Sequence, residues 1–581
     1  MPDEVLKKIY NEDGTTCILV TFEDSIAEDR TLDAIQTLRN ITEKETKISG
    51  MSATNLDIKD ICNSEVKIYV LIAVILCVVI LAVALDSYMA PVIILGNIGI
   101  AVLYNLGSNI IFGEISYITK AISAVLQLGV TMDFAIFLYH SYKRQKETTS
   151  DNDKAMSTAI METIRSVVGS STTTIAGFLA LCTMQLTLGK DIGLVMAKGV
   201  LLGVICTVTI LPALILIFDK LITKTNHKEI LPKFTKIKDF IISHYKVITI
   251  VFILIVPIAT YGYVHTESYY NLTSGLPDTL PSVQANNKLA EDFGMESTEL
   301  ILIDKNISDE KVSQMLNKIE NLDGVKSVLS YSKITNSIGM PVEFLPEDVL
   351  KIFTSDKYQM IIISSSYENA TDELNNQITE INKIIKTYDE NSLMAGEGPL
   401  MKDLVDIANH DFNSVNTFSI AVIFALMFIV LQSISLPVIL IIVIEFAIFI
   451  NMGIPGLLGH QVPFVASIVI GTIQLGATID YAILITNKYI ARRKENLNKK
   501  EAIDYALGTS ISSIVVSGLC FFGATFGVGA YSKIAMISSL CVLISRGALI
   551  SMVSVICVLP AFLIICDKII CKTTLGMRVQ K

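Results

Sequence analysis

Apolar residues fill eleven long runs of this chain, and two polar stretches interrupt them. Each run has about 18 or more residues with few charges, which is the length that a helix needs to cross a bilayer. The pattern predicts a polytopic α-helical membrane protein of about 11 spans. The runs are 67–86, 89–112, 118–142, 160–188, 191–218, 246–264, 414–432, 436–457, 463–488, 504–530 and 535–566.

The two polar stretches, 1–66 and 265–413, are long enough to form folded domains. Each contains a run rich in β-branched residues and then an amphipathic segment, which predicts a strand followed by a helix. We therefore expect small α+β domains. The predicted pairs are 15–22 with 31–39 and 360–364 with 372–385.

Similar sequence recurs along the chain at offsets between 344 and 348 positions. Residues 2–7 resemble 346–351, and the Leu-Pro-Ala of 211–213 returns at 559–561. One copy has six spans, which bring the chain back to its starting side, so the copies are expected to be parallel repeats. The first copy lacks its opening span and part of its polar domain. We therefore expect the chain to be the downstream part of a longer transporter.

Lys and Arg gather in the short connections after the third and ninth spans, in the linker 219–245 and in the tail 567–581. If the spans alternate, these segments share one side, which the charge bias predicts to be cytoplasmic. The polar domains then face the extracytoplasmic side of the cell membrane. The expected order is a partial porter-type outer domain 1–66, a five-span bundle 67–218, the linker 219–245, a span 246–264, a second outer domain 265–413, a bundle 414–566 and the tail 567–581.

Composition excludes several classes of function. The chain is 51% hydrophobic with a net charge of −10, and its mean hydropathy is +0.56. Residues 265–413 contain 25 Asp and Glu against 11 Lys and Arg, which argues against nucleic-acid binding. The sequence has no glycine-rich phosphate loop, nucleophile elbow or CxxC spacing, so we expect no enzymatic activity, metal or cofactor. Cys17 and Cys62 lie in a polar domain, and the sequence leaves their pairing open.

One acidic motif occurs in both halves of the chain. Asp133 lies near the middle of the third span, and Asp480 lies in the ninth span, 347 positions later. Gly129 and Gly476 precede these acids by four residues, which puts each glycine on the helix face of its acid and permits close helix approach. If the repeats pack around a pseudo-two-fold axis, the acids meet. Ionisable residues within spans often mark proton pathways, although protonated structural carboxyls are the alternative.

Other polar residues within the spans carry weaker signals. Thr173 and Ser517, from Ser/Thr-rich stretches in the fourth and tenth spans, either hydrogen-bond to the acids or join helices to one another. Lys198 and Arg546 occupy matching positions and are either counter-charges to the acids or cations that extend to the membrane interface. Glu445 has no acidic counterpart in the first copy, which has Gly99 there.

These features resemble the MMPL family of the resistance–nodulation–division superfamily. The resemblance rests on the Gly-x-x-x-Asp-aromatic motif in two spans, the basic run after each, the Leu-Pro-Ala sequences and the domain layout. It implies a proton-driven exporter of lipids or hydrophobic small molecules, in which two Asp–Tyr pairs contact each other across the repeats. The matching positions are Asp133 with Phe134 and Asp480 with Tyr481. Because Phe134 replaces the family's tyrosine, we expect Asp133 to contact Tyr481 and Asp480 to be less constrained.

Three functions fit the sequence. The first is a proton-coupled exporter, with protons as the coupling ion and Asp133, Asp480 and Tyr481 as the coupling residues. The second is a lipid-binding module similar to sterol-sensing proteins, which does not pump, and the third is a secretion accessory of the SecDF type. The expected partner is a membrane lipid or a hydrophobic small molecule, with no nucleic acid. The family occurs as monomers and trimers, so the resemblance implies either state.

Overall fold

The computed structural model describes residues 15–18, 20–43, 45–149, 151–228, 230–232, 234–270, 275–293, 297–333 and 353–577. The expected match between residues 2–7 and 346–351 lies outside these residues. The chain forms two compact units, which are described separately. Met1–Asp60 and Tyr269–Ile407 form one, here called the polar unit, and Ile61–Ser268 and Ala408–Lys581 form the other, the membrane unit.

The membrane unit contains all eleven predicted spans as helices long and apolar enough to cross a membrane. Several begin or end beyond the apolar run, because polar residues with good helix propensity continue the same helix. The spanning helices are α3 (Met51–Ala84), α4 (Met89–Gly107), α5 (Tyr117–Thr148), α6 (Asn152–Ala180), α7 (Thr187–Ile217), α10 (Tyr245–Val264), α16 (Glu397–Leu431), α17 (Ser435–Leu458), α18 (Phe464–Lys494), α19 (Lys499–Tyr531) and α20 (Ala535–Ile565).

Short elements connect these helices. The expected linker and tail contain helices of their own, and two brief 3₁₀ turns follow α4 and α6. The elements are η1 (Ser108–Phe112), η2 (Leu181–Thr183), α8 (Asp219–Lys224), α9 (Thr235–Ser243), α21 (Asp567–Thr573) and the two-residue strands β1 (Ser268–Tyr269) and β6 (Val462–Pro463). We call α3–α7 the first helix group and α10 with α16–α20 the second. End A is where α5, α7, α18 and α20 begin, and end B is the opposite end.

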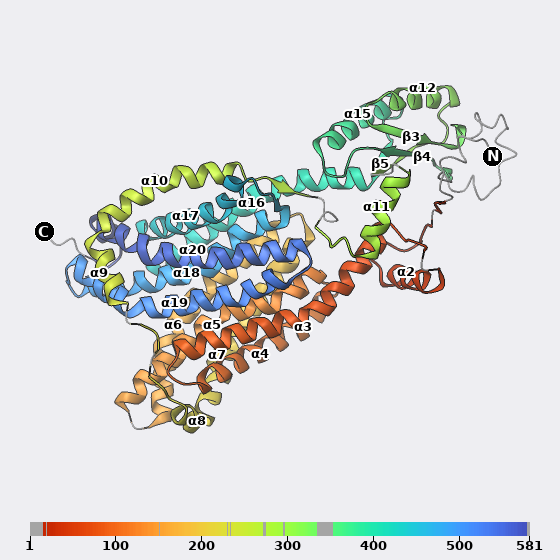
Figure 1. The fold of residues 1–581 in the computed structure, drawn as a ribbon. Helices are drawn as coiled ribbons and strands as arrows, with labels where there is room; N and C mark the ends of the chain where they lie inside the picture. Colours follow the sequence, from red (N-terminus) through yellow and green to blue (C-terminus); the bar gives the residue numbers. More distant parts are fainter. Residues whose placement is uncertain are drawn as a thin grey trace. The chain divides into compact units, whose positions relative to one another are not determined.

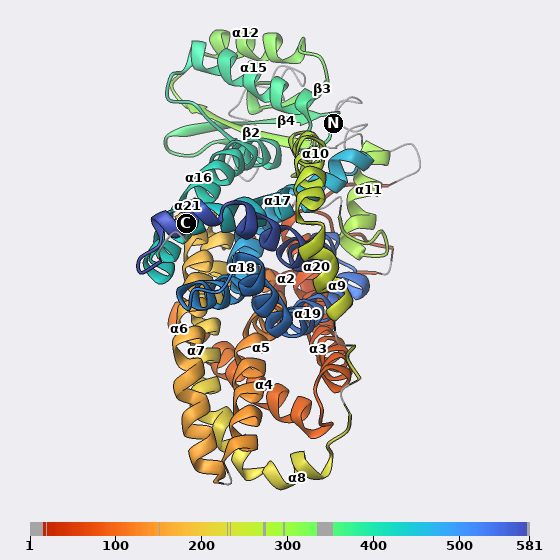
Figure 2. The ribbon, with the colours of Figure 1, turned by 90° about the vertical axis from the view of Figure 1, so that its left-hand side faces the viewer.

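Two helices are enclosed by the others. α5 packs against α4, α6 and α7 of its own group and against α19 of the second group. α18 packs against α17, α19 and α20 of its own group and against α6 of the first. The four helices α5, α6, α18 and α19 are neighbours in the middle of the membrane unit (Figures 1 and 2). Residues on all faces of α5 and α18 are therefore buried, which agrees with their mostly apolar sequence around the helix.

The polar unit contains an antiparallel four-stranded sheet in the order β3-β4-β2-β5. Alternate residues of β2 face the core, as the period of a strand requires, and Ile301 pairs with Ile361 of β4. α12 and α15 lie side by side on one face of the sheet (Figures 1 and 2). The bounds are β2 (Ser297–Asp304), α12 (Asp309–Glu320), β3 (Val325–Leu329), β4 (Tyr358–Ser365), α15 (Asp372–Tyr388) and β5 (Leu393–Gly396).

The predicted strand 360–364 and helix 372–385 are therefore confirmed as β4 and α15. The predicted helix 31–39 is confirmed as α2 (Asp29–Ile41). The predicted strand 15–22 is wrong for the residues described there, which include only a single bridge at Thr16. Its side chains at Ile18 and Val20 are largely exposed, so no sheet buries one face of this segment.

The two chain segments of the polar unit meet around Asp57. Arg39 of α2 donates two hydrogen bonds to the Asp57 carboxylate, and the backbone N–H of Ser282 donates a third at 2.9 Å. Ser282 lies in the first turn of α11 (Pro281–Phe293), so the carboxylate also faces a helix N-terminus. Both cysteines whose pairing the sequence left open, Cys17 and Cys62, are free thiols.

Candidate functional site

Asp133 of α5 and Asp480 of α18 are buried in the middle of the membrane unit, each with 4% of its surface exposed. The two carboxyls are close enough to influence each other electrostatically. Tyr481, 2% exposed, lies near both. Oδ1 of each acid has no hydrogen-bond partner among the described residues. The structure thus brings three sequence-predicted residues together as a central acidic site.

The two glycines of the acidic motif do not face each other. Gly476 of α18 packs against Gly177 of α6, where a Cβ added to Gly177 would lie 3.1 Å from the Gly476 Cα. Gly129 of α5 is covered by the ring of Phe521 from α19, which a Cβ at Gly129 would overlap. α18 therefore approaches α6 closely, because the two glycines permit backbone contact there, whereas the Phe521 ring lies between α5 and α19 at Gly129.

Hydroxyl groups surround Asp480 more closely than Asp133. The Thr174 hydroxyl of α6 shares its single proton among three acceptors, Oδ2 of Asp480 at 3.3 Å and the carbonyl oxygens of Gly476 at 3.0 Å and Ser170 at 3.2 Å. Ser170 and Thr173 also lie beside this acid, although the Thr173 hydroxyl donates to the Ser170 carbonyl oxygen at 2.6 Å. Asp480 was expected to be the less constrained acid, and the Thr174 hydrogen bond reverses that expectation.

Asp133 has a less polar environment. Ser517 of α19 lies beside its carboxyl, yet the Ser517 Oγ makes no hydrogen bond within the described structure. Phe134, which follows the acid, is fully buried and brings no hydroxyl. Tyr481 is close enough to both acids to interact with them electrostatically, but neither Asp133 nor Asp480 accepts a hydrogen bond from it in the described structure. The contact between Asp133 and Tyr481 that the family resemblance implies therefore stays a prediction.

The matching cations Lys198 and Arg546 bind asparagines instead of the acids. Lys198 donates to the Asn105 carbonyl oxygen at 3.0 Å and to Oδ1 of Asn109 at 2.6 Å. Arg546 donates through Nε to Oδ1 of Asn451 at 2.8 Å. Within the described residues neither cation contacts Asp133 or Asp480, so the central acidic site contains no counter-cation there.

The same asparagines connect these cations to the acidic helices. Asn105 donates to Oε1 of Gln127 at 2.9 Å, and Asn451 donates to Oε1 of Gln474 at 2.9 Å. Gln127 and Gln474 each precede their acid by six residues on α5 and α18. Both groups therefore contain an Asn–Gln network with the same connectivity, about two turns from each acid toward end A.

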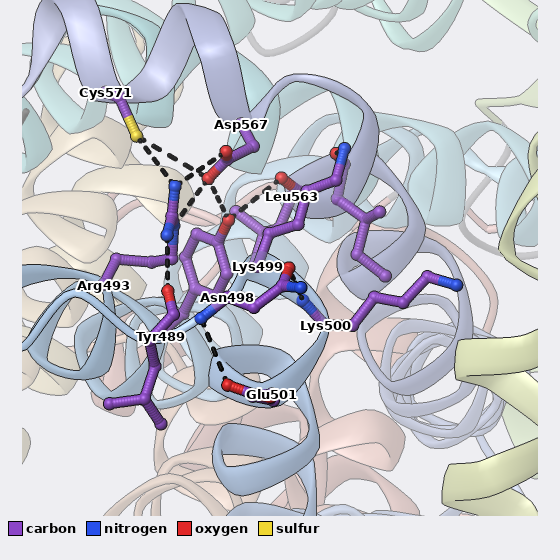
Figure 3. A network of polar contacts seen from close by, with 11 residues as sticks. Tyr489, Arg493, Asn498, Lys499, Lys500, Glu501, Leu563, Asp567 and Cys571 are labelled. Carbon is purple, nitrogen blue, oxygen red and sulfur yellow. Dashed lines mark hydrogen bonds and ion pairs between the residues drawn. The ribbon is translucent and has the colours of Figure 1, made fainter. Parts of the chain in front are cut away.

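At end B, a buried ion pair ties α18 to α21. Arg493 donates to both carboxylate oxygens of Asp567, at 2.8 and 2.9 Å, and Tyr489 donates to Oδ1 at 2.6 Å (Figure 3). Cys571 lies against the same carboxylate and guanidinium (Figure 3). Tyr489 and Arg493 follow Asp480 on one helix, so this contact fixes the end B half of α18.

The first group has the matching contact on α5. Lys146 donates to both oxygens of Asp219 at 2.6 Å, and Tyr142 donates to Oδ1 at 3.0 Å. A further ion pair joins Lys143 to Asp86, which also accepts a hydrogen bond from Tyr139. The position matching Asp86 in the second group is Gln432, so that group lacks this second carboxylate.

Glu445 lies apart from the central acidic site. It is half-buried on α17, close to Tyr263 of α10. Tyr263 stacks on Phe449 with ring centroids 4.7 Å apart. The matching residue Gly99 has no atom within 4 Å of the place where its Cβ would stand. Glu445 is thus a contact of the second group alone.

The sequence missed several residues of these contacts. Thr174 was part of a Ser/Thr run in which only Thr173 was singled out. Asp219 and Asp567 lie outside the apolar runs. However, nearly the same number of positions separates these two acids as separates their partners on α5 from those on α18, so the repeat could have indicated them. Within the described residues, no group of three or more His, Cys, Asp or Glu is arranged to hold a metal ion.

Comparison with known proteins adds three findings. The apo-petrobactin exporter of Bacillus anthracis is 22% identical over 587 residues, which cover 91% of this chain and 76% of that protein. MJ1562 of Methanocaldococcus jannaschii, named as a membrane protein, is 24% identical over 38% of this chain and 59% of its own length. ActII-3 of Streptomyces coelicolor, likewise named, is 34% identical over 18% of this chain and 14% of its own length. The chain thus spans less than two-thirds of the latter two relatives.

The family comparison covers most of the sequence. The model of the MMPL family matches residues 2–241 and 274–573, which include both acids, both ion pairs at end B and the sheet of the polar unit. Together with the eleven membrane-capable helices, this match identifies a multi-pass membrane protein. The chain belongs to the MMPL family.

Proposed function

We propose that this protein exports lipids or hydrophobic small molecules at the expense of the proton gradient, with Asp133, Asp480 and Tyr481 as the proton-coupling residues. The observation that carries the proposal is the pair of buried acids, each with an unpartnered oxygen and without a cation nearby in the described structure. A buried carboxylate without compensation is costly, so such a carboxyl is stable when it holds a proton. Protonation and release at this site would change the charge between the two helix groups.

The two helix groups fit the proposed coupling. Matching Asn–Gln networks and matching end B ion pairs support a duplicated structural unit arranged as parallel repeats. Each acid faces a span of the other group, Asp480 through Thr174 of α6 and Asp133 through Ser517 of α19. A change of charge at either acid therefore acts across the interface between the groups, where transporters built from repeats move.

The basic residues support an orientation in the plasma membrane. Lys143, Arg144, Arg492 and Arg493 lie near end B, where α5 and α18 end. The positive-inside rule places that end, with the C-terminal tail, in the cytoplasm. The polar unit would then be extracytoplasmic, where a porter-type domain receives or releases substrate.

The substrate class rests on the family and on the exporter relative. Apo-petrobactin, which that relative's name gives as its cargo, is one probe, and a fluorescent phospholipid is the other. The purified chain would be reconstituted in liposomes with an imposed pH gradient, and uphill movement of each probe would be followed. We expect wild-type protein to move at least one probe and to stop when the gradient is dissipated.

Substitution of the acids tests the mechanism. Asp133→Asn and Asp480→Asn should each abolish uphill movement, because an amide keeps the shape but exchanges no proton. Lys220→Gln, in the exposed α8 at end B, is the matched control and should transport normally. Unimpaired export by both acid variants would overturn proton coupling. Lipid binding that is independent of pH, without movement, would favour the non-pumping alternative.

A further inference from the structure

Asp411 of α16 makes a contact across the two helix groups at end A. Its side chain is fully buried. Oδ1 accepts the backbone N–H of Gln185 at 2.9 Å, and Oδ2 accepts that of Leu186 at 3.0 Å. These residues lie between η2 and α7, so a carboxylate from the second group caps a helix of the first. A carboxylate is favoured there by the free N–H groups and the helix dipole.

Glu65 of α3 makes the reciprocal contact. Its Oε2 accepts the backbone N–H of Lys533 at 3.4 Å, and Tyr69 donates to the same oxygen. The Ser532 hydroxyl lies 2.8 Å from the same Tyr69 hydroxyl oxygen, within hydrogen-bond distance. Lys533 lies just before α20, as Gln185 lies just before α7. A carboxylate of the first group thus holds the junction before α20 in the second.

Each held junction continues directly from a helix that touches an acid. α6 carries Thr174, which hydrogen-bonds to Asp480, and η2 connects its end to the junction held by Asp411. α19 carries Ser517, which lies beside Asp133, and ends at the junction held by Glu65. The spacing from Thr174 to Gln185 is 11 residues along nearly continuous helix.

The helices that carry the two carboxylates pack along the same partners. α3 lies against α19, where Cβ atoms at Gly523 and Gly527 would meet Ile80 and Ile72. α16 lies against α6, where a Cβ at Gly169 would stand 3.8 Å from Val430. α3 and α16 are also the helices by which the chain passes between the polar unit and the membrane unit. The contacts at end A therefore involve α3 and α16, the helices through which a change in the membrane unit would reach the polar unit.

We propose that Asp411 and Glu65 are positioning residues that couple the proton-binding acids to α16 and α3. The inference rests on the proposed function for its role in export, but the coupling itself is measurable without a substrate. Protonation of Asp480 changes its contact with Thr174, α6 shifts, and the junction held by Asp411 changes with it. In the same way, protonation of Asp133 shifts α19, and the junction held by Glu65 changes with it.

Hydrogen–deuterium exchange of the full chain in lipid nanodiscs tests the coupling, with the peptide covering 184–190 as the reporter. Asp411→Asn should raise exchange at this junction by about tenfold, because two charge-assisted hydrogen bonds are weakened. Asp480→Asn mimics the protonated acid, so its exchange at the same junction should differ from that of wild type by about threefold or more at a pH high enough for wild-type Asp480 to release its proton. Thr174→Val should suppress that second effect, since it removes the hydroxyl through which the acid contacts α6.

A matched control is available at the other end of α6. Asp151 caps that helix by accepting the backbone N–H groups of Asp153 and Lys154 at end B. Asp151→Asn removes a similar carboxylate from a spanning helix without crossing between the groups, and should leave exchange at 184–190 unchanged. Asp411→Glu should retain part of the protection that Asp411→Asn loses.

The coupling and the proposed function fail in different measurements. At a pH where wild-type Asp480 is ionised, equal exchange at 184–190 in wild type and Asp480→Asn would overturn the coupling, even if Asp480→Asn abolished export. Unimpaired export by both Asp133→Asn and Asp480→Asn would overturn proton-driven transport, even if the exchange changed. If both hold, Asp411→Asn should lower the maximal export rate more than it changes the substrate concentration for half-maximal rate, and Asp411→Glu should restore part of that rate.

Discussion

The hydroxyl of Thr174 donates a hydrogen bond to the Asp480 carboxylate, and these two residues belong to different helix groups. The position 347 residues after Thr174 is Phe521, whose ring covers Gly129 near Asp133. The acid of the second group thus has a hydroxyl where the acid of the first has an aromatic ring. The two acids are related by sequence but have different environments.

Thr174→Val should lower export by up to about tenfold, because a hydrogen bond contributes roughly 0.5–1.5 kcal/mol and valine keeps the shape of threonine without the hydroxyl. The measurement is the initial export rate from liposomes over a range of pH. Thr172→Val is the control, because the exposed Thr172 donates only to the carbonyl oxygen of Val168 in its own helix. Equal losses in the two variants would show that the Thr174–Asp480 contact has no special role.

The contact between Gly177 and Gly476 predicts unequal effects of two similar substitutions. A Cβ at Gly177 would lie 3.1 Å from the backbone of Gly476, whereas a Cβ at Gly476 would lie 3.6 Å from that of Gly177. Gly177→Ala must push α6 and α18 apart, and we expect it to destabilise the protein by about 1–3 kcal/mol. Gly476→Ala fits within ordinary contact distance and should cost less than about 0.5 kcal/mol.

Thermal unfolding of the purified variants checks this order. Gly96→Ala in α4 is the control, because no atom lies within 4 Å of a Cβ there. Its better helix propensity should make it neutral or stabilising by up to about 1 kcal/mol. A larger loss for Gly476→Ala than for Gly177→Ala would contradict the packing described here.

The two matching ion pairs at end B, Arg493 with Asp567 and Lys146 with Asp219, should differ in strength. Arg493 and Asp567 have side chains that are 5% and 10% exposed, whereas Lys146 and Asp219 are 32% and 12% exposed. Removing one partner of a buried pair leaves an uncompensated charge, so Arg493→Met should cost about 3–5 kcal/mol. Lys146→Met should cost about 1 kcal/mol, since the lysine is one-third exposed and Asp219 keeps the hydrogen bonds from Tyr142 and Asn152.

Unfolding midpoints of the single and double variants measure the difference. Adding Asp567→Leu to Arg493→Met should recover much of the lost stability, because both charges are then absent. If the double variant is no more stable than Arg493→Met alone, the cost comes from packing around the arginine and not from the unpaired carboxylate.

The spans were predictable because each is a long apolar run with no competing interpretation. The acids, their glycines and Tyr481 were also predictable, because a charged residue within such a run is conspicuous and occurs at the same place twice. Which neighbouring residue covers each glycine was not predictable. Four-residue spacing fixes the face of a helix, but which neighbour covers that face depends on packing between distant spans, as Phe521 and Gly177 show.

The capping carboxylates and the conformation of residues 15–22 were harder to predict from the sequence. Asp411 and Glu65 lie in polar segments that precede apolar runs, and nothing in their local sequence indicates that they cap helices of the other group. Residues 15–22 have a strand-like composition, yet composition records only a preference for a half-buried surface. Among the described residues no strand covers the exposed Ile18, and the described part of the segment is irregular apart from the bridge at Thr16.

Glu299 on β2 predicts a pH-dependent stability of the polar unit. Burial raises the pKa of this carboxyl to about 7, and the nearby Glu397 contributes in the same direction. Ser297 donates to Oε1 at 2.6 Å, and Oε2 has no partner among the described residues. The folded protein thus holds a proton that the unfolded chain releases near pH 4.3. The stabilisation is fully present below that pH and is lost as the pH rises through about 7.

Glu299→Gln stays neutral at every pH, so it should remove this dependence. The free energy of unfolding of the wild-type polar unit should fall by about 3 kcal/mol between pH 5 and pH 8 because of this residue, and the variant should lack that fall. Hydrogen exchange of the β2 peptide in the full chain at the two pH values, corrected for intrinsic exchange, measures it. Glu310→Gln, at an exposed site on α12, should keep the wild-type dependence. If Glu299→Gln also keeps it, the carboxyl is ionised in the folded protein, and its burial must be compensated by a contact that the described residues do not supply.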